Sequence, residues 1–278
     1  MNYLITRNTM TDMAGIAMMQ GAMIGLKEMD PAAKFAALVR PENDSESRII
    51  PAYIDPDGCE AAFNWADCVL DIGGLCAGFD PARLLYIKTC RKLDIPYIYM
   101  AQSFHNPDPE LIKDVPLVAR GPRAAQAIKE ITGTTPLVGA DLSFLIEPVK
   151  KKFPKYKRGY TTHKGKPWGD MLVACREEPS VQLIWKPEAE PLLDEHSGIP
   201  VFSGPPASIF GVIAELDEIH TARYHSAVGA VMHGKPCHFY VNDRTKYDDL
   251  MYFEGMPIDE LKKSAMVSCE FVIEMMRG

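Results

Sequence analysis

The chain has 278 residues, of which 47% are hydrophobic and 24% are charged, a composition typical of soluble globular proteins. Its net charge of −7 and isoelectric point near 5.5 argue against a surface that binds nucleic acid over its whole extent. No apolar run approaches the roughly 20 residues needed to cross a bilayer. The N-terminal residues lack the basic-then-apolar layout of a secretory signal. We therefore expect a cytoplasmic protein without a transmembrane segment.

The residue types that bind transition metals show no metal-binding pattern in the sequence. The seven cysteines are scattered, with no Cys-x-x-Cys pair and no spacing typical of zinc. We expect them to be buried, reduced thiols. His220, His233 and His238 do not form a set with metal-ligand spacing either. The sequence therefore predicts no metal site.

Strands and helices alternate through the first half of the chain. Strands are predicted over 2–6, 34–39, 48–54, 68–74, 96–102 and 116–120, helices over 13–29, 81–93 and 124–133, and a final element over 137–146. Short, continuous apolar strands separated by helices indicate a parallel sheet that is covered on both faces.

A strongly basic segment follows. Residues 150–166 read KKKFPKYKRGYTTHKGK, with lysine, arginine and aromatic residues but no acid. We interpret residues 149–168 as a linker. It is either a solvated interdomain loop or a positively charged rim that gathers an anionic acceptor or polymer.

Alternation resumes after the basic segment. Strands are predicted over 170–175, 199–204, 218–222 and 237–241, and helices over 181–196, 206–218, 223–234 and 258–278. We expect an α/β protein of two Rossmann-like lobes, residues 1–148 and 169–278. Ligands of such folds bind near the carboxyl ends of the strands, here in the cleft between the lobes.

The segment between Glu215 and Asp249 carries the clearest chemistry. Arg223 and His225 stand at the start of a small-residue helix, and Lys246 follows the next strand. Guanidinium and imidazolium groups pair well with phosphate and carboxylate oxygens. A spacing of two residues does not put both side chains on one helix face. It fits a strand-to-helix turn, where the helix N-terminus also favours an anion.

Several other residues are candidates with a structural alternative beside the functional one. Asp12 is a candidate base or acceptor-binding carboxylate, or else a helix cap. Gly73 and Gly74 permit close backbone approach to a ligand, although they lack the spacing of a dinucleotide fingerprint. Arg120 and Arg123 lie at a strand-to-helix junction of the first lobe and either bind an anion or serve the structure.

Two further side chains have equally open roles. Lys246 either neutralises a phosphate or forms a salt bridge with Asp248 or Asp249. His105 follows a predicted strand and either reaches the cleft or is inert.

These motifs, in this order, resemble the polysaccharide pyruvyltransferase family over most of the chain. The most specific match is Arg223-Tyr224-His225, followed by Gly234-Lys235-Pro236 and Lys246. Upstream, DIGGL at 71–75 resembles the family's glycine-rich strand end. VARGPRAAQAIKEITG at 118–133 resembles its Val-x-Arg helix start, and GADLSFLIEP at 139–148 its Asp-x-x-Phe element. The first turn departs from the family's Asn-x-Gly-Asp, because residues 8–12 read NTMTD without the glycine.

The resemblance implies a two-lobed fold like that of GT-B glycosyltransferases, with the acceptor on the first lobe and the donor on the second. The implied chemistry is transfer of a pyruvyl group from phosphoenolpyruvate onto a sugar diol, which gives a cyclic ketal. No metal, nicotinamide or other cofactor is implied. Arg120 resembles a family arginine and joins the expected donor-binding set.

The expected chemistry assigns roles to the candidate residues. Arg223 would clamp the donor's carboxylate or phosphate, and His225 would hold the phosphate or supply a proton near neutral pH. Two alternatives stay open: a GT-B-like glycosyltransferase that uses a sugar nucleotide, and a non-catalytic protein whose basic linker holds an anionic polymer. A nucleic-acid-linked acceptor, the linkage formed and the oligomeric state also stay open.

Overall fold

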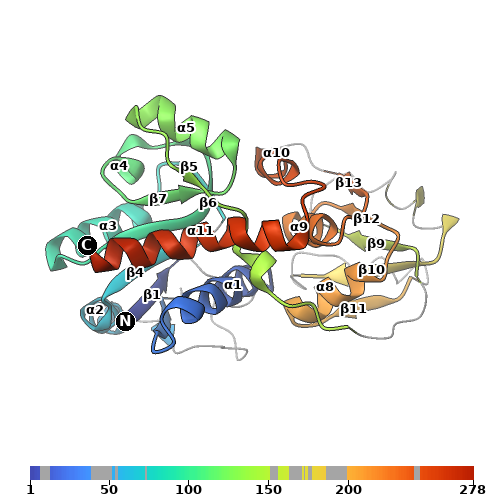
Figure 1. Ribbon diagram of the computed structural model, residues 1–278, viewed down its shortest axis with the longest axis horizontal. Helices are drawn as coiled ribbons and strands as arrows, with labels where there is room; N and C mark the ends of the chain where they lie inside the picture. Colours follow the sequence, from blue (N-terminus) through green and yellow to red (C-terminus); the bar gives the residue numbers. More distant parts are fainter. Residues whose placement is uncertain are drawn as a thin grey trace. The chain divides into compact units, whose positions relative to one another are not determined.

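A computed structural model describes residues 1–6, 13–38, 52–53, 56–72, 74–150, 156–162, 171, 173–174, 177–185, 199–240 and 245–278. Contacts divide the chain into two compact units, each built around its own parallel sheet (Figure 1). Unit 1 comprises Met1–Thr11, Gly15–Leu145 and Lys262–Gly278, and unit 2 comprises Asp12–Ala14 and Ile146–Leu261.

The sheet of unit 1 has the strand order β3-β2-β1-β4-β6-β7-β8, with β5 paired to β6. All of its pairings are parallel, as the sequence pattern predicted. The strands are β1 Asn2–Thr6, β2 Lys34–Leu38, β3 Ala52–Tyr53, β4 Cys68–Ile72, β5 Leu75–Gly78, β6 Tyr97–Pro107, β7 Leu117–Ala119 and β8 Leu137–Val138. The helices are α1 Met13–Met29, α2 Pro56–Trp65, α3 Pro81–Leu93, α4 Pro109–Ile112 and α5 Pro122–Thr132, followed by a 3₁₀ turn at Leu142–Leu145.

The sheet of unit 2 has the strand order β11-β10-β9-β12-β13, again with parallel pairings. Its strands are β9 Arg158–Thr161, β10 Ser180–Ile184, β11 Val201–Ser203, β12 Glu218–Thr221 and β13 Cys237–Phe239. Its helices are α8 Pro206–Ala214, α9 Tyr224–Met232 and α10 Thr245–Met251, and the chain closes with α11 Ile258–Arg277. The α/β class with two Rossmann-like parallel sheets is therefore confirmed.

Three predicted elements of the second half were wrong. The basic segment contains β9, the middle strand of the unit 2 sheet, where Gly159, Tyr160 and Thr161 are all buried. Residues 181–184, predicted as helical, belong to the fully buried β10. The described residues of the strand predicted over 170–175 are helical instead. A short apolar run does not by itself distinguish a buried strand from a buried helix.

The closing helix α11 does not belong to the second half alone. Its residues from Lys262 onward group with unit 1, whereas the sequence-based division placed the whole helix in the second lobe. The amide of Ala140 donates to the carbonyl of Ser264 at 3.1 Å. An added Cβ at Gly25 would meet Cys269 Sγ at 2.6 Å, so α1 and α11 approach closely there. The buried stripe Leu261, Ala265, Cys269, Val272 and Ile273 follows helical spacing.

In the described part of the chain, no helix combines the length and the apolar character that a membrane span requires.

A buried carboxylate organises the carboxyl end of β4. Asp71 has no exposed surface, and its two oxygens accept from Arg83 Nε at 2.8 Å and Nη2 at 3.2 Å. Tyr97 Oη donates to it at 2.7 Å and Gln102 Nε2 at 2.6 Å. Burial opposes the charge of Arg83, but Asp71 outweighs burial and raises the pKa of that guanidinium. The carboxylate is therefore compensated by one cation and two neutral donors, as a buried charge requires.

A second buried ion pair lies beside the first. Arg120 is 1% exposed, and its Nη1 lies 3.1 Å from Asp141 Oδ2. Its Nε and Nη2 donate to Ser103 Oγ at 3.0 and 2.7 Å, and Nη2 also donates to the carbonyl of Gly74 at 3.0 Å. A bulge in β6 precedes Ser103, since Ala101 has a φ of 49° and the register with β7 shifts between Tyr99 and Gln102. Such bulges redirect side chains. Here the side chain of Gln102 reaches Asp71, and that of Ser103 reaches Arg120.

The Arg120 network makes a testable prediction about stability. Arg120→Gln should lower the free energy of unfolding by about 3–5 kcal/mol, because Asp141 would keep its buried charge without its cation. Urea denaturation followed by circular dichroism measures this. Arg123→Gln, at an exposed position three residues away, should change stability by less than about 0.5 kcal/mol. The double variant Arg120→Gln/Asp141→Asn should lose less than the sum of the single variants. A loss under about 1 kcal/mol for Arg120→Gln would contradict the account.

A glycine in α8 makes the second prediction. A Cβ added to Gly211 would overlap the backbone carbonyl of Val149, whose amide donates to Ala207 at 2.9 Å. Intrinsic helix propensity favours alanine over glycine by about 0.5–1 kcal/mol, so propensity and packing have opposite signs here. We expect Gly211→Ala to lower the free energy of unfolding by about 1–3 kcal/mol, because the clash with Val149 outweighs the gain in helix propensity.

The control for this variant is Gly204→Ala, where the new Cβ would lie 3.4–3.7 Å from its neighbours. It should stay within about 1 kcal/mol of the wild type in the same thermal or urea unfolding experiment. A Gly211→Ala variant as stable as wild type would show that the Val149 backbone moves away without cost.

Candidate functional site

The turn between β12 and α9 places Arg223 at the N-terminus of a nine-residue helix. Thr221 Oγ1 accepts from the amide of Arg223 at 2.7 Å and donates to its carbonyl at 2.8 Å. Thr161 Oγ1, on the neighbouring strand, contacts the same hydroxyl. Arg223 itself is the N-cap residue, with an extended backbone (φ −117°, ψ 130°). The predicted strand-to-helix turn is thus confirmed, and its geometry is held by a buried hydroxyl.

His225 lies in an aromatic environment on the first turn of α9. Its ring is 5.8 Å from that of Trp185 and 5.3 Å, edge to face, from that of Tyr224. Trp185 is 1% exposed, and its indole N–H donates to Ser226 Oγ at 2.6 Å. The carbonyl of Trp185 accepts from the amide of Met13, the residue after Asp12, at 3.0 Å. Trp185 therefore fixes the first turn of α9 and with it the half-buried imidazole.

Helix α10 packs against α9 and brings a third cation to the same part of unit 2 (Figure 1). The ring of Tyr247 lies 5.8 Å from that of Tyr224 and 4.7 Å from that of Phe239. Burial raises the pKa of Tyr247, and the positive charge of Arg223 opposes that shift. Lys246, the preceding residue, is half-buried at the start of α10. Arg223 and His225 at the helix N-terminus suit a compact anion, and Lys246 belongs to the helix that packs against α9.

The other predicted site residues lie elsewhere. Arg120 and Gly74 belong to unit 1, where the Arg120 guanidinium is engaged by Asp141, Ser103 and the Gly74 carbonyl. This geometry favours the structural alternative for Arg120, a role in positioning the glycine turn. Gly74 has a φ of +87°, which favours glycine, and an added Cβ would meet nothing within 4 Å. Asp12 and Gly73 lie outside the described residues.

Two histidines considered in the sequence do not join the cationic group. His105 is exposed on β6 of unit 1, and His233 lies at the far end of α9 from Arg223. A depression of about 830 Å³ belongs to unit 1 and is lined by residues such as Pro116, Leu117 and Pro136 at the amino ends of β7 and β8.

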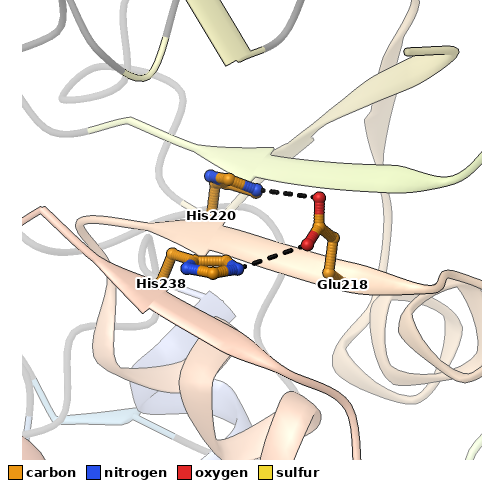
Figure 2. A group of neighbouring side chains, drawn as sticks. All are labelled: Glu218, His220 and His238. Atoms are coloured by element: carbon orange, nitrogen blue, oxygen red, sulfur yellow. Dashed lines mark hydrogen bonds and ion pairs between the residues drawn. The ribbon is translucent and has the colours of Figure 1, made fainter. Parts of the chain in front are cut away.

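One cluster in unit 2 was missed from the sequence. Glu218 and His220 on β12 and His238 on β13 bring their polar atoms together (Figure 2). Each histidine Nε2 lies 3.2 Å from an oxygen of Glu218. The spacing of Glu218 and His220 already puts them on one face of a strand. The contribution of His238 depends on its register opposite His220, which no local sequence pattern specifies.

Comparison with solved structures confirms the fold class. A UDP-N-acetylglucosamine 2-epimerase from Rickettsia bellii is 10% identical with a TM-score of 0.57, covering 100% of this chain and 97% of its own. A UGT transferase from Siraitia grosvenorii in complex with UDP is 8% identical with a TM-score of 0.56, covering 100% of both chains. A UDP-GlcNAc 2-epimerase from Neisseria meningitidis bound to UDP-GlcNAc is 10% identical with a TM-score of 0.57, covering 99% of this chain and 100% of its own. No curated protein sequence matches the chain significantly. These likenesses, at such low identity, establish the two-unit fold.

The family follows from the sequence comparison. A family model described as polysaccharide pyruvyl transferase matches residues 16–244. The matched region includes both buried ion pairs of unit 1 and the turn that carries Arg223 and His225, and it ends two residues before Lys246. This agrees with the resemblance found in the motifs. The chain belongs to the polysaccharide pyruvyl transferase family and is a transferase.

Proposed function

We propose that this enzyme transfers a pyruvyl group from phosphoenolpyruvate to a diol of a glycan acceptor and forms a cyclic ketal. The observation that carries the proposal is the placement of Arg223 and His225 at the N-terminus of α9, in a member of this family. Phosphoenolpyruvate carries a phosphate and a carboxylate within one small molecule, and several converging cations match that charge distribution.

The reaction balances with groups of this kind. A proton adds to the methylene carbon of the enol, and the central carbon becomes cationic. One acceptor hydroxyl attacks that carbon, phosphate leaves with its bridging oxygen, and the second hydroxyl closes the ketal. The two hydroxyl protons balance the one gained by the new methyl group and the one carried away by phosphate. The enzyme must therefore supply a proton donor and stabilise a departing anion.

The side chains at α9 suit these two tasks. Arg223 would hold the carboxylate or phosphate through two parallel N–H···O bonds. His225, whose ring is oriented by Trp185 and Tyr224, would donate a proton near neutral pH. Lys246 would neutralise the departing phosphate. Asp12 is retained as the proposed acceptor-side carboxylate, and no metal or organic cofactor takes part in this chemistry.

A sugar-nucleotide donor is the second candidate function. Two of the similar structures are named as complexes with UDP or UDP-GlcNAc, which favours a nucleotide in this fold. A helix N-terminus beside an arginine also suits a diphosphate. The two candidates differ in what binds tightly: the proposal requires phosphoenolpyruvate to bind more tightly than UDP, and the alternative requires the reverse.

The described part of the basic segment disfavours the non-catalytic alternative. Lys157 is paired with Glu178 at 2.8 Å, and Arg158 is paired with Glu218. These cations are balanced by acids of other strands and loops, so they contribute little net charge for an anionic polymer. We place the enzyme in the cytoplasm as part of the same proposal.

Turnover by variants of the cationic group tests the proposed function. With phosphoenolpyruvate and a panel of sugar diols, Arg223→Ala and His225→Ala should each lower phosphate release at least about 100-fold. Arg223→Lys should recover little, because a single ammonium does not reproduce the bidentate bond. Circular dichroism should show the wild-type fold in each variant.

The matched control is Arg277→Ala, which removes an exposed arginine at the end of α11 and should leave turnover unchanged. Wild-type rates in both Arg223→Ala and His225→Ala would refute the site. Silence of the wild type across a broad panel, together with tighter calorimetric binding of UDP than of phosphoenolpyruvate, would refute the donor.

A further inference from the structure

The cluster missed from the sequence forms an ordered column on one face of the unit 2 sheet. Glu218 and His220 are two residues apart on β12, so both side chains point to the same face of the sheet. The strand register sets His220 opposite His238 on β13 and opposite Tyr160 on β9. Arg158 of β9 lies opposite Glu218. Three adjacent parallel strands therefore present two imidazoles, one carboxylate and one guanidinium at a single place.

The ligand atoms of the three residues gather closely enough for a metal ion to be considered. His220 Nε2 lies 3.2 Å from Glu218 Oε1, and His238 Nε2 lies 3.2 Å from Glu218 Oε2. Both ring nitrogens are directed toward the carboxylate (Figure 2). One atom from each residue falls within 4.8 Å of the other two. A tetrahedral ion with metal–ligand bonds of about 2.0–2.1 Å holds its ligand atoms roughly 3.3 Å apart. The rings of His220 and His238 are stacked with centroids 4.4 Å apart, so the imidazoles must rotate for the three side chains to share one ion.

The surroundings of His220 orient it as a ligand. Its Nδ1 lies 3.0 Å from Tyr240 Oη, which leaves Nε2 for the cluster. Metal-binding histidines characteristically use their second nitrogen for such an outer hydrogen bond.

Glu218 is held in place by its hydrogen-bond partners. Arg158 contacts Oε1, and its Nη1 donates to the carbonyl of Ala174 at 2.8 Å. Oε2, which faces His238, is the oxygen best placed for an ion. Arg158 would then orient the carboxylate without contacting the ion, and its positive charge would repel the bound cation to some extent.

We propose that Glu218, His220 and His238 bind one divalent ion of the zinc class, with a fourth position open to water. Two imidazoles and one carboxylate suit zinc, cobalt or nickel, whereas magnesium and calcium prefer oxygen ligands throughout. His238 is 49% exposed, so an ion reaches the site from solvent. The bound ion would tie the edge strand β13 to β12. This site uses none of the residues assigned to the donor, and it stands or falls separately from the proposed function.

Metal titration of the full chain tests the proposal. After treatment with a chelator and dialysis, ZnCl₂ should bind with a stoichiometry of one by calorimetry and raise the Tm, and MgCl₂ should do neither. CoCl₂ should give the visible absorption of a low-coordinate nitrogen and oxygen site, without the near-ultraviolet charge-transfer band of a thiolate ligand. Failure of zinc to bind stoichiometrically, or a cobalt spectrum with thiolate bands, would overturn the proposal.

Variants locate the ion. His238→Ala removes an exposed side chain and should weaken zinc binding at least about tenfold and abolish the rise in Tm. Glu218→Gln, which keeps the shape of the carboxylate, should weaken binding as well. His105→Ala, an exposed histidine of unit 1, and Cys237→Ser, the neighbour of His238 on the alternate face of β13, should both bind like wild type. Undiminished binding in His238→Ala and Glu218→Gln, or loss of binding in Cys237→Ser, would show that other residues bind the zinc and would overturn the proposal.

Discussion

The hydroxyl of Thr221 holds the turn between β12 and α9, and through that turn it fixes the position of Arg223. It accepts from the arginine amide and donates to the arginine carbonyl, and it is itself contacted by Thr161. The backbone of Arg223 therefore stays extended while the next residue is already helical. An arginine whose backbone is anchored this way stands at the positive end of a helix, where the helix dipole favours an anion. The proposed donor site depends on this local constraint.

Arginine serves two different purposes in the protein, and burial decides which. Arg83 and Arg120 of unit 1 are almost fully buried, and each is paired with an equally buried aspartate. Their guanidinium groups hold Asp71 near the carboxyl end of β4, Ser103 of β6 and the carbonyl of Gly74 in place. Arg223 is half-buried beside Tyr224 and Tyr247 at a helix end. The first two stabilise the structure, and the third is the arginine proposed to bind the donor.

Local patterns in the sequence predicted the parts of the fold that local patterns determine. The apolar strands β1, β4 and β12, the small-residue helix α9 and its N-terminal turn all follow from residues close together in the chain. β9 was missed, because its residues lie in a run of lysines and its burial comes from pairing with β10 and β12 on both sides. The assignment of the end of α11 to unit 1 depends on Ser264 and Cys269 meeting residues more than a hundred positions away.

The same distinction applies to the site residues. Arg223 and His225 could be proposed as site residues because their motif is contiguous. The guanidinium of Arg120 is bound by Ser103 and Asp141, and the local sequence does not reveal these contacts. In the cluster of Glu218, His220 and His238, the first two residues can be grouped by their spacing along β12. The position of His238 depends on the register of β13. Residues that strand pairing brings together cannot be grouped by spacing along the chain.

A crystal structure of the protein with phosphoenolpyruvate tests the central claim most directly. The account predicts the donor at the N-terminus of α9, with its phosphate or carboxylate oxygens 2.7–2.9 Å from the Arg223 guanidinium and His225 within reach of the molecule. A donor bound with no contact to Arg223 or His225, or a site at α9 that takes up UDP while excluding phosphoenolpyruvate, would contradict it.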